Sequence, residues 1–248
     1  VEANVSEPTV NRFCRSMDTR GFPDFKLHLA QSLANGTPYV NRNVDEDDSV
    51  ESYTGKIFES AMASLDHVRQ SLDNAAVNRA VDLLTQAKKI AFFGLGSSAA
   101  VAHDAMNKFF RFNVPVIYSD DIVLQRMSCM NCSDDDVIVL ISHTGRTKSL
   151  VELAQLAREN DAMVIALTSP GTPLAREATL AITLDVPEDT DIYMPMVSRL
   201  AQLTVIDVLA TGFTLRRGAK FRDNLKRVKE ALKESRFDKE LLIKSDDR

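Results

Sequence analysis

The sequence predicts an α/β fold: a five-stranded, Rossmann-like parallel sheet covered by helices, preceded by a partial all-α region. Two observations predict it. Five compact apolar runs lack the polar alternation of a half-exposed strand, which indicates strands buried on both faces. Helical segments separate the first four runs, and strands that alternate with helices are typical of a doubly wound parallel sheet.

The elements are expected in the following order. A helical pattern runs from residue 51 to about 87, where apolar residues recur at spacings of three to five. The expected strands are 88–96, 114–120, 135–142, 162–169 and 180–186. A last amphipathic helix places four apolar side chains on one face, those of Phe221, Leu225, Val228 and Leu232.

Composition narrows the classes of protein to consider. The chain has 248 residues, of which 44% are hydrophobic and 26% charged, as in ordinary globular proteins. The net charge of -5 gives no global attraction to nucleic acid or to anionic membrane. No apolar run approaches the roughly 18 residues of a membrane span. With three cysteines and no secretory signal, we expect reduced thiols and a cytoplasmic protein. The start at Val1 suggests a fragment whose beginning has been removed.

Three segments divide the chain. Residues 1–36 form a short helical region. Residues 37–50 contain a proline, two asparagines and four consecutive acids from Asp45 to Asp48, which is typical of a solvated linker. Residues 51–248 would form the second domain, with the sheet core at 88–215.

Two loops carry the functional signal. "GLGSSA" (94–99) follows the first strand, and "SHTGRT" (142–147) follows the third. Ligands of parallel sheets bind at the carboxyl ends of strands, and helix N-termini attract anions. Hydroxyl donors surround both helix starts: Ser97, Ser98, Ser142, Thr144 and Thr147. We therefore predict a phosphate cradle formed by both loops.

Two alternatives remain open. "GLGSSA" also fits a G-x-G-x-x-A dinucleotide fingerprint, with Asp120 and Asp121 near the second strand as ribose-binding acids. The hydroxyls of Ser142, Thr144 and Thr147 could instead merely cap the helix that starts near Lys148.

"FFGLGSSAAVAHDA", "DDDVIVLISHTGRTKSLVELAQLAREN" and "MVIALTSPGTPLAREA" together resemble a SIS (sugar isomerase) domain over about residues 88–215. The resemblance implies phosphosugar binding by hydroxyls of both loops. By position it assigns Ser98 to the first loop and Ser142, Thr144 and Thr147 to the second. Ser97, His143 and Gly145 are further ligand-binding candidates. Arg146, Lys148 and Arg199 are candidates for binding a ligand carboxylate.

The amino-terminal region resembles the second half of a helix-turn-helix, with Ser6 as the N-cap of a recognition helix. Inward-facing positions would be Val10, Phe13, Cys14 and Met17; DNA-facing positions would be Thr9, Asn11, Arg12 and Arg15. "TVNRFCR" with "GFPDFK" is similar to RpiR-type transcription factors, which join this motif to a SIS effector domain.

The resemblance implies a DNA-binding regulator of sugar catabolism that is no enzyme. It points to regulators whose effector is 2-keto-3-deoxy-6-phosphogluconate. The alternative is a SIS-domain phosphosugar isomerase, with Glu152, His103 and His143 as generic candidates for the base. No metal is expected, because "CMNC" (129–132) is a lone C-x-x-C without a second pair. No cofactor is expected either. A homodimer or larger assembly is expected, since operators of helix-turn-helix proteins have two half-sites.

Overall fold

The computed structural model describes residues 7–17, 19–26, 43–188 and 194–233. Contacts within the chain define two compact units. The first comprises residues 1–62 and 189–194, and the second comprises residues 63–188 and 195–248. No helix among the described residues is both long enough and apolar enough to span a membrane.

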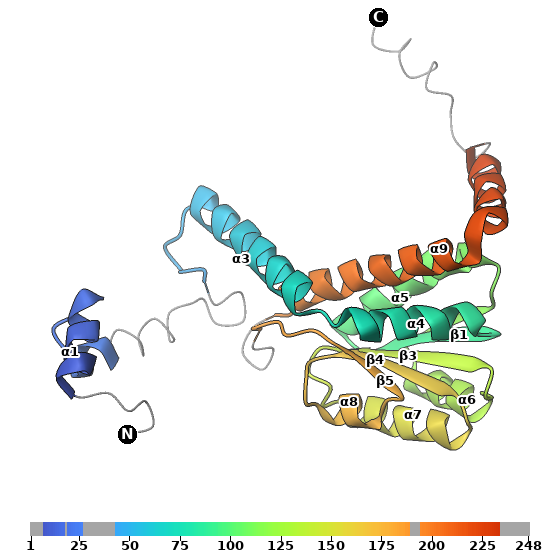
Figure 1. Cartoon of the computed structure of the whole chain (residues 1–248), viewed down its shortest axis with the longest axis horizontal. Helices are drawn as coiled ribbons and strands as arrows, with labels where there is room; N and C mark the ends of the chain where they lie inside the picture. The colour runs from blue at the N-terminus through green and yellow to red at the C-terminus, as the bar shows by residue number, and fades with distance from the viewer. Residues whose placement is uncertain (1–6, 18, 27–42, 189–193, 234–248) are drawn as a thin grey trace, which may run out of the picture. The chain divides into compact units, whose positions relative to one another are not determined.

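The second unit contains a five-stranded parallel sheet with the order β2-β1-β3-β4-β5 (Figure 1). Its strands are β1 (Lys89–Gly94), β2 (Val116–Ser119), β3 (Asp136–Ser142), β4 (Met163–Thr168) and β5 (Leu180–Thr183). The order reverses between β1 and β3, so the fold has its topological switch point there. The predicted five-stranded parallel α/β fold is confirmed.

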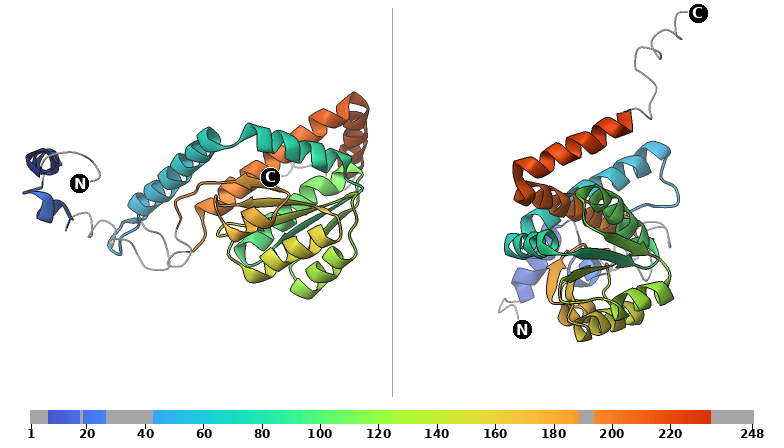
Figure 2. Two further views of the ribbon diagram at one scale, coloured as in Figure 1. Left: turned by 60° about the horizontal axis from the view of Figure 1, so that its bottom comes forward. Right: turned by 90° about the vertical axis from the view of Figure 1, so that its right-hand side faces the viewer.

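Helices cover both faces of the sheet (Figures 1 and 2). One face carries α4 (Asn74–Gln86), α5 (Ser97–Phe109) and α9 (Val197–Lys233). The other carries α6 (Ile122–Met130), α7 (Lys148–Glu159) and the short α8 (Pro173–Glu177). A 3-10 turn, η1 (Phe110–Phe112), follows α5 directly.

The core lies in two layers because the strands are apolar on both sides. Phe92, Val139 and Ile165 face the α4–α5–α9 layer, whereas Phe93 and Leu140 face the α6–α7–α8 layer. Each fully buried side chain of this size stabilises the fold by about 1.5–3 kcal/mol. The apolar runs therefore fix the sheet, and the sheet fixes where its polar loops meet.

Helix boundaries differ from the prediction at one place. The continuous helical pattern expected over 51–87 is two helices, α3 (Val50–Ser71) and α4. The break has a local cause: the Asp73 side chain accepts a hydrogen bond from the backbone N–H of Ala75, at 2.8 Å, and so caps α4.

The last helix also departs from a simple amphipathic rod. α9 bends at Gly218, where φ is +76°, a value that favours glycine. Beyond the bend, Phe221 and Leu225 pack against the core, whereas Val228 and Leu232 are exposed.

In the first unit, α1 (Glu7–Ser16) is the helix expected to read DNA. Ser6, its expected N-cap, lies outside the described residues. Cys14 is fully buried as predicted, but the expectation that Phe13 and Met17 pack inward is wrong. They are 54% and 56% exposed, although the Phe13 ring touches that of Phe25.

Candidate functional site

The two hydroxyl-rich loops lie side by side at one edge of the sheet. β1 and β3 are adjacent and parallel, with Gly94 in register with Ile141, so their carboxyl ends coincide. The loop after β1 leads into α5 on one face, and the loop after β3 leads into α7 on the other. Two helix N-termini therefore lie together at the switch point, where ligands of such sheets bind, and we call this meeting point of the two loops the crevice.

Close approach of backbone shapes the first loop. A Cβ at Gly94 would lie 2.6 Å from the carbonyl oxygen of Ser98, so only glycine lets α5 begin this close to the strand. Gly96 has a φ of +56° and supplies no side-chain cap to α5. Ser98 is buried within the first turn, and Ser97 is half-buried. Within the described part of the chain, neither serine hydroxyl has a hydrogen-bond partner.

The second loop is ordered by its own side chains. The Ser142 hydroxyl accepts a hydrogen bond from the Gly145 N–H at 3.2 Å, and the Thr144 hydroxyl accepts one from the Arg146 N–H at 3.4 Å. Thr147 occupies the N-cap position of α7, yet its side chain makes no capping hydrogen bond. The alternative that Thr147 merely caps α7 is therefore not supported. The Thr147 hydroxyl can still donate a hydrogen bond to a ligand.

Residues at the end of β4 and just after it support the second loop, and the sequence analysis did not predict them. The Ser169 N–H donates to the His143 carbonyl at 3.0 Å, and the Thr168 hydroxyl donates to the same oxygen at 3.4 Å. Gly145, at φ +56°, packs so tightly that a Cβ there would overlap Thr168 and Thr172. The hydroxyls in "TSPGT" were the available signal, at the end of the neighbouring strand.

His143 is held at both ring nitrogens. Nε2 lies 3.3 Å from the Glu188 carbonyl oxygen, and Nδ1 lies 3.4 Å from the Ser169 hydroxyl. A carbonyl can only accept, so Nε2 carries the proton and Nδ1 accepts from the hydroxyl. His143 therefore fixes the position of the loop at the crevice.

Glu188, which the sequence did not single out, caps α9. Its carboxylate accepts hydrogen bonds from the N–H groups of Met196, Val197 and Ser198 and from the Ser198 hydroxyl. Burial alone would raise its pKa, but these hydrogen bonds together hold the pKa below the ordinary glutamate value. Glu188 thus stays ionised and ties the His143 contact to the start of α9.

Gln125 lies beneath the crevice on α6 and is fully buried. Its amide donates to the carbonyl oxygens of Gly94, at 3.3 Å, and Ser119, at 2.7 Å, and so joins the ends of β1 and β2. With neutral hydroxyls beside two helix N-termini, the crevice is suited to bind an anion.

The residues of the competing interpretations have structural roles. Asp121 caps α6, because its carboxylate accepts hydrogen bonds from the N–H groups of Val123 and Leu124. These bonds give Asp121 a structural role in place of the predicted binding of a ribose. Burial raises the pKa of Cys129 to about 12, and burial also raises the pKa of Cys132, which favours the protonated thiol at both positions. Among the described residues, no group of His, Cys, Asp or Glu could hold a metal ion.

The predicted DNA-facing residues all lie on α1. Arg12 and Arg15 are exposed, and Thr9 is half-buried. Asn11 is exposed, but its side-chain oxygen accepts from the Phe22 N–H at 3.2 Å. That bond joins α1 to the following segment, which gives Asn11 a structural role as well.

Comparison with known proteins identifies a family for the amino-terminal region and for the sheet domain. Residues 83–212 match the SIS domain, and residues 1–36 match the helix-turn-helix domain of the rpiR family. The chain is 94% identical, over all of its length and 86% of the relative's, to the HTH-type transcriptional regulator HexR of Escherichia coli. The predicted resemblance to RpiR-type regulators is confirmed.

Solved structures share the fold. The NanR protein of Vibrio vulnificus, solved with ManNAc-6P, matches with a TM-score of 0.68 and 24% identity, over 96% of this chain and 84% of NanR. A phosphoheptose isomerase of Francisella tularensis matches with a TM-score of 0.56 and 18% identity, over 67% of this chain and 98% of the isomerase. This chain therefore shares its fold with NanR and with an isomerase.

Proposed function

This chain belongs to the RpiR family of transcriptional regulators, which join a helix-turn-helix to a SIS domain, and from this premise we propose that it senses a phosphosugar. The proposed effector is 2-keto-3-deoxy-6-phosphogluconate, and the proposed role is the control of sugar catabolism without catalysis. Residues 1–36 contact operator DNA through Thr9, Asn11, Arg12 and Arg15. Residues 37–50 are the linker, and residues 51–248 are the effector domain.

One observation carries the proposal. Buried Ser98 and Ser142 stand at the carboxyl ends of two adjacent strands, each beside a helix N-terminus. Thr147 adds a hydroxyl without a capping bond. Ser97 and Thr144 complete the cradle through their hydroxyls. Gly145 gives the second loop its tight turn, and His143 holds that loop in place. A dianionic phosphate accepts several such donors at once.

Titration calorimetry with 2-keto-3-deoxy-6-phosphogluconate tests the proposal. Each hydrogen bond to a charged phosphate contributes about 1.5–3 kcal/mol, so Ser98→Ala and Ser142→Ala should each weaken binding roughly ten- to a hundredfold. Thr204→Ala is the matched control, because among the described residues the Thr204 hydroxyl bonds only to the Leu200 carbonyl, within α9. Equal affinity in all four proteins would refute the cradle.

A phosphosugar isomerase is the second candidate, favoured by the fold shared with phosphoheptose isomerase. An isomerase requires a base held near the sugar carbons. His103 is exposed with its ring against Tyr118, and Glu152 is exposed beside Arg126. Incubation with aldose and ketose phosphates distinguishes the candidates: we expect no interconversion, and catalytic turnover would establish the enzyme.

The assembly is proposed to be a homodimer or larger, in the cytoplasm. A helix-turn-helix that reads a two-fold operator requires two copies related by the same symmetry.

A further inference from the structure

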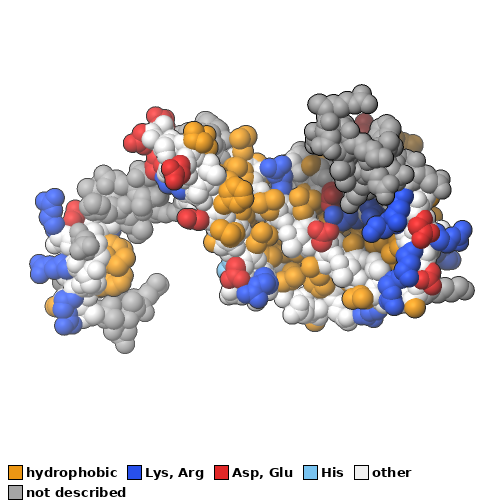
Figure 3. Space-filling model, turned by 90° about the horizontal axis from the view of Figure 1, so that it is seen from above, with side chains coloured by type: hydrophobic (Ala, Val, Ile, Leu, Met, Phe, Trp, Pro, Cys, Tyr) orange, Lys and Arg blue, Asp and Glu red, His pale blue; other side chains and the backbone are white. Residues whose placement is uncertain are grey.

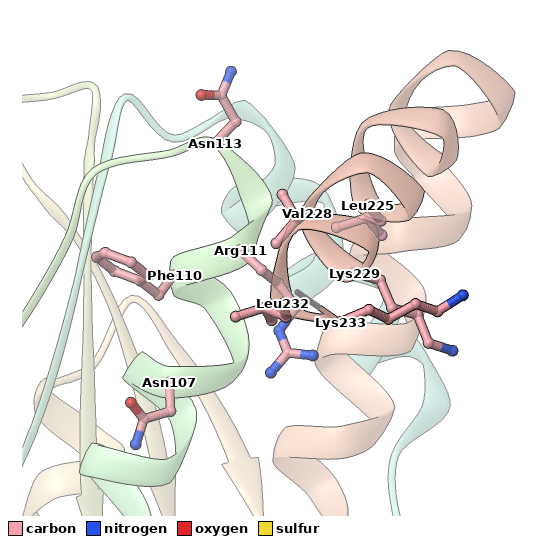
Figure 4. Close-up of a pocket in the computed structure, with 9 residues that line it drawn as sticks. All are labelled: Asn107, Phe110, Arg111, Asn113, Leu225, Val228, Lys229, Leu232 and Lys233. Carbon is pink, nitrogen blue, oxygen red and sulfur yellow. The ribbon is translucent and has the colours of Figure 1, made fainter. Parts of the chain in front are cut away.

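A cleft of about 890 Å³ opens between the end of α5, with η1, and the part of α9 beyond Gly218 (Figure 4). We call it the α5–α9 cleft. Its apolar lining includes Phe110, which is 73% exposed, and Val228. Three cations also line it: Arg111, Lys229 and Lys233. Among the described residues, none of the three has an ion-pair partner.

The surroundings of the cleft are strongly basic. Residues 219–233 contain six Lys or Arg and two Asp or Glu. Lys and Arg side chains gather at this end of the sheet unit in Figure 3. A partner must therefore offer apolar side chains together with negative charge.

The chain itself carries a surface of that chemistry on α3. Phe58 and Met62, one turn apart, are 65% and 60% exposed. Glu51 and Glu59 flank them on the helix and have no ion-pair partner among the described residues. Residues 45–62 contain six acidic residues and one basic residue. We call Glu51, Phe58, Glu59 and Met62 the α3 stripe.

We propose that the α3 stripe of a second copy of this chain docks in the α5–α9 cleft. The apolar pair at i and i+4 is the anchor pattern of a helix that lies in a groove. The glutamates would meet the cations of the cleft. Pairing two copies of the basic 219–233 segment with each other would instead bring like charges together. Each copy offers one stripe and one cleft, so two reciprocal contacts close a two-fold dimer.

The proposal rests on the homodimer proposed above, and sedimentation of the full chain tests it. Phe58→Asp or Lys229→Glu should weaken dimerisation by roughly a hundredfold or more, because each change acts twice in the dimer. Val123→Asp is the matched control, since Val123 is a 62% exposed aliphatic residue on α6. It should leave the dimer intact.

A charge swap and a cross-link address the partner directly. Glu59→Lys and Lys229→Glu should each weaken dimerisation. The double variant that carries both changes should recover part of the lost dimer affinity. A mixture of Met62→Cys chains with Val228→Cys chains should form a disulfide-linked dimer on oxidation.

In sedimentation, the proposal is overturned if the wild-type chain is a monomer at micromolar concentration or if the Phe58→Asp variant dimerises with unchanged affinity. It is also overturned if the control Val123→Asp dissociates the dimer, or if the mixture of cysteine variants forms no cross-link. If Lys229→Glu lowered only the affinity for non-specific DNA, the cleft would belong to nucleic acid and the proposal would likewise fall. Effector calorimetry on Phe58→Asp keeps the two proposals separate, since the phosphate cradle is built within one chain.

Discussion

Gly145→Ala should disturb the cradle without removing any hydroxyl. The Gly145 φ of +56° costs an alanine about 1–2 kcal/mol. The new Cβ would also lie 2.5 Å from the Thr168 hydroxyl oxygen and 2.6 Å from the Thr172 Cβ. Forced overpacking of this kind costs about 1–3 kcal/mol more. The free energy of unfolding should therefore fall by about 2–5 kcal/mol, since both costs apply.

Gly171→Ala separates the two costs. Gly171 also has a positive φ, of +71°, but nothing lies within 4 Å of a Cβ there. The free energy of unfolding of Gly171→Ala should therefore fall only by the cost of the positive φ, about 1–2 kcal/mol. Urea unfolding gives the free energies, and calorimetry with 2-keto-3-deoxy-6-phosphogluconate gives the affinities. Gly145→Ala should also weaken effector binding, whereas Gly171→Ala should not. Equal stability losses in the two variants would refute the steric reasoning.

Three further predictions concern Thr147, Glu188 and the arginine pair of α1. Thr147→Val should weaken effector binding, measured by calorimetry, with little loss of stability, because this hydroxyl makes no capping bond. The depressed pKa of Glu188 means that its ionisation stabilises the fold above the ordinary carboxyl pKa, about 4.3, and that this stabilisation is lost as the pH falls through the folded value. Thermal unfolding from pH 7 to 3 should show a smaller acid-dependent fall for Glu188→Gln than for wild type. In a protein carrying the whole helix-turn-helix, the double variant Arg12→Ala, Arg15→Ala should lose the operator mobility shift and keep its effector affinity. If the variant still binds the operator, α1 is not the recognition helix.

The sheet could be predicted because its signal is local. The centre of β3, residues 137–141, is an uninterrupted apolar run, and burial on both faces leaves no other place for such a run. The two loops were visible for the same reason, since glycines and hydroxyls interrupt the apolar pattern at Gly94 and Ser142.

The supporting contacts could not be predicted because they join distant parts of the chain. His143 reaches Glu188 across 45 residues, and Gln125 reaches Gly94 across 31. Neither Glu188 nor Gln125 lies in a recognisable motif. Helical periodicity likewise predicted Phe13 and Met17 inside the first unit, but spacing identifies one face of a helix and not what covers it.

Electron density from crystals grown with 2-keto-3-deoxy-6-phosphogluconate tests the central claim most directly. The phosphate should lie between the Ser98 and Ser142 hydroxyls, within hydrogen-bond distance of both and beside the first turns of α5 and α7. A phosphate bound elsewhere, or density absent from the crevice at saturating effector, would contradict the account.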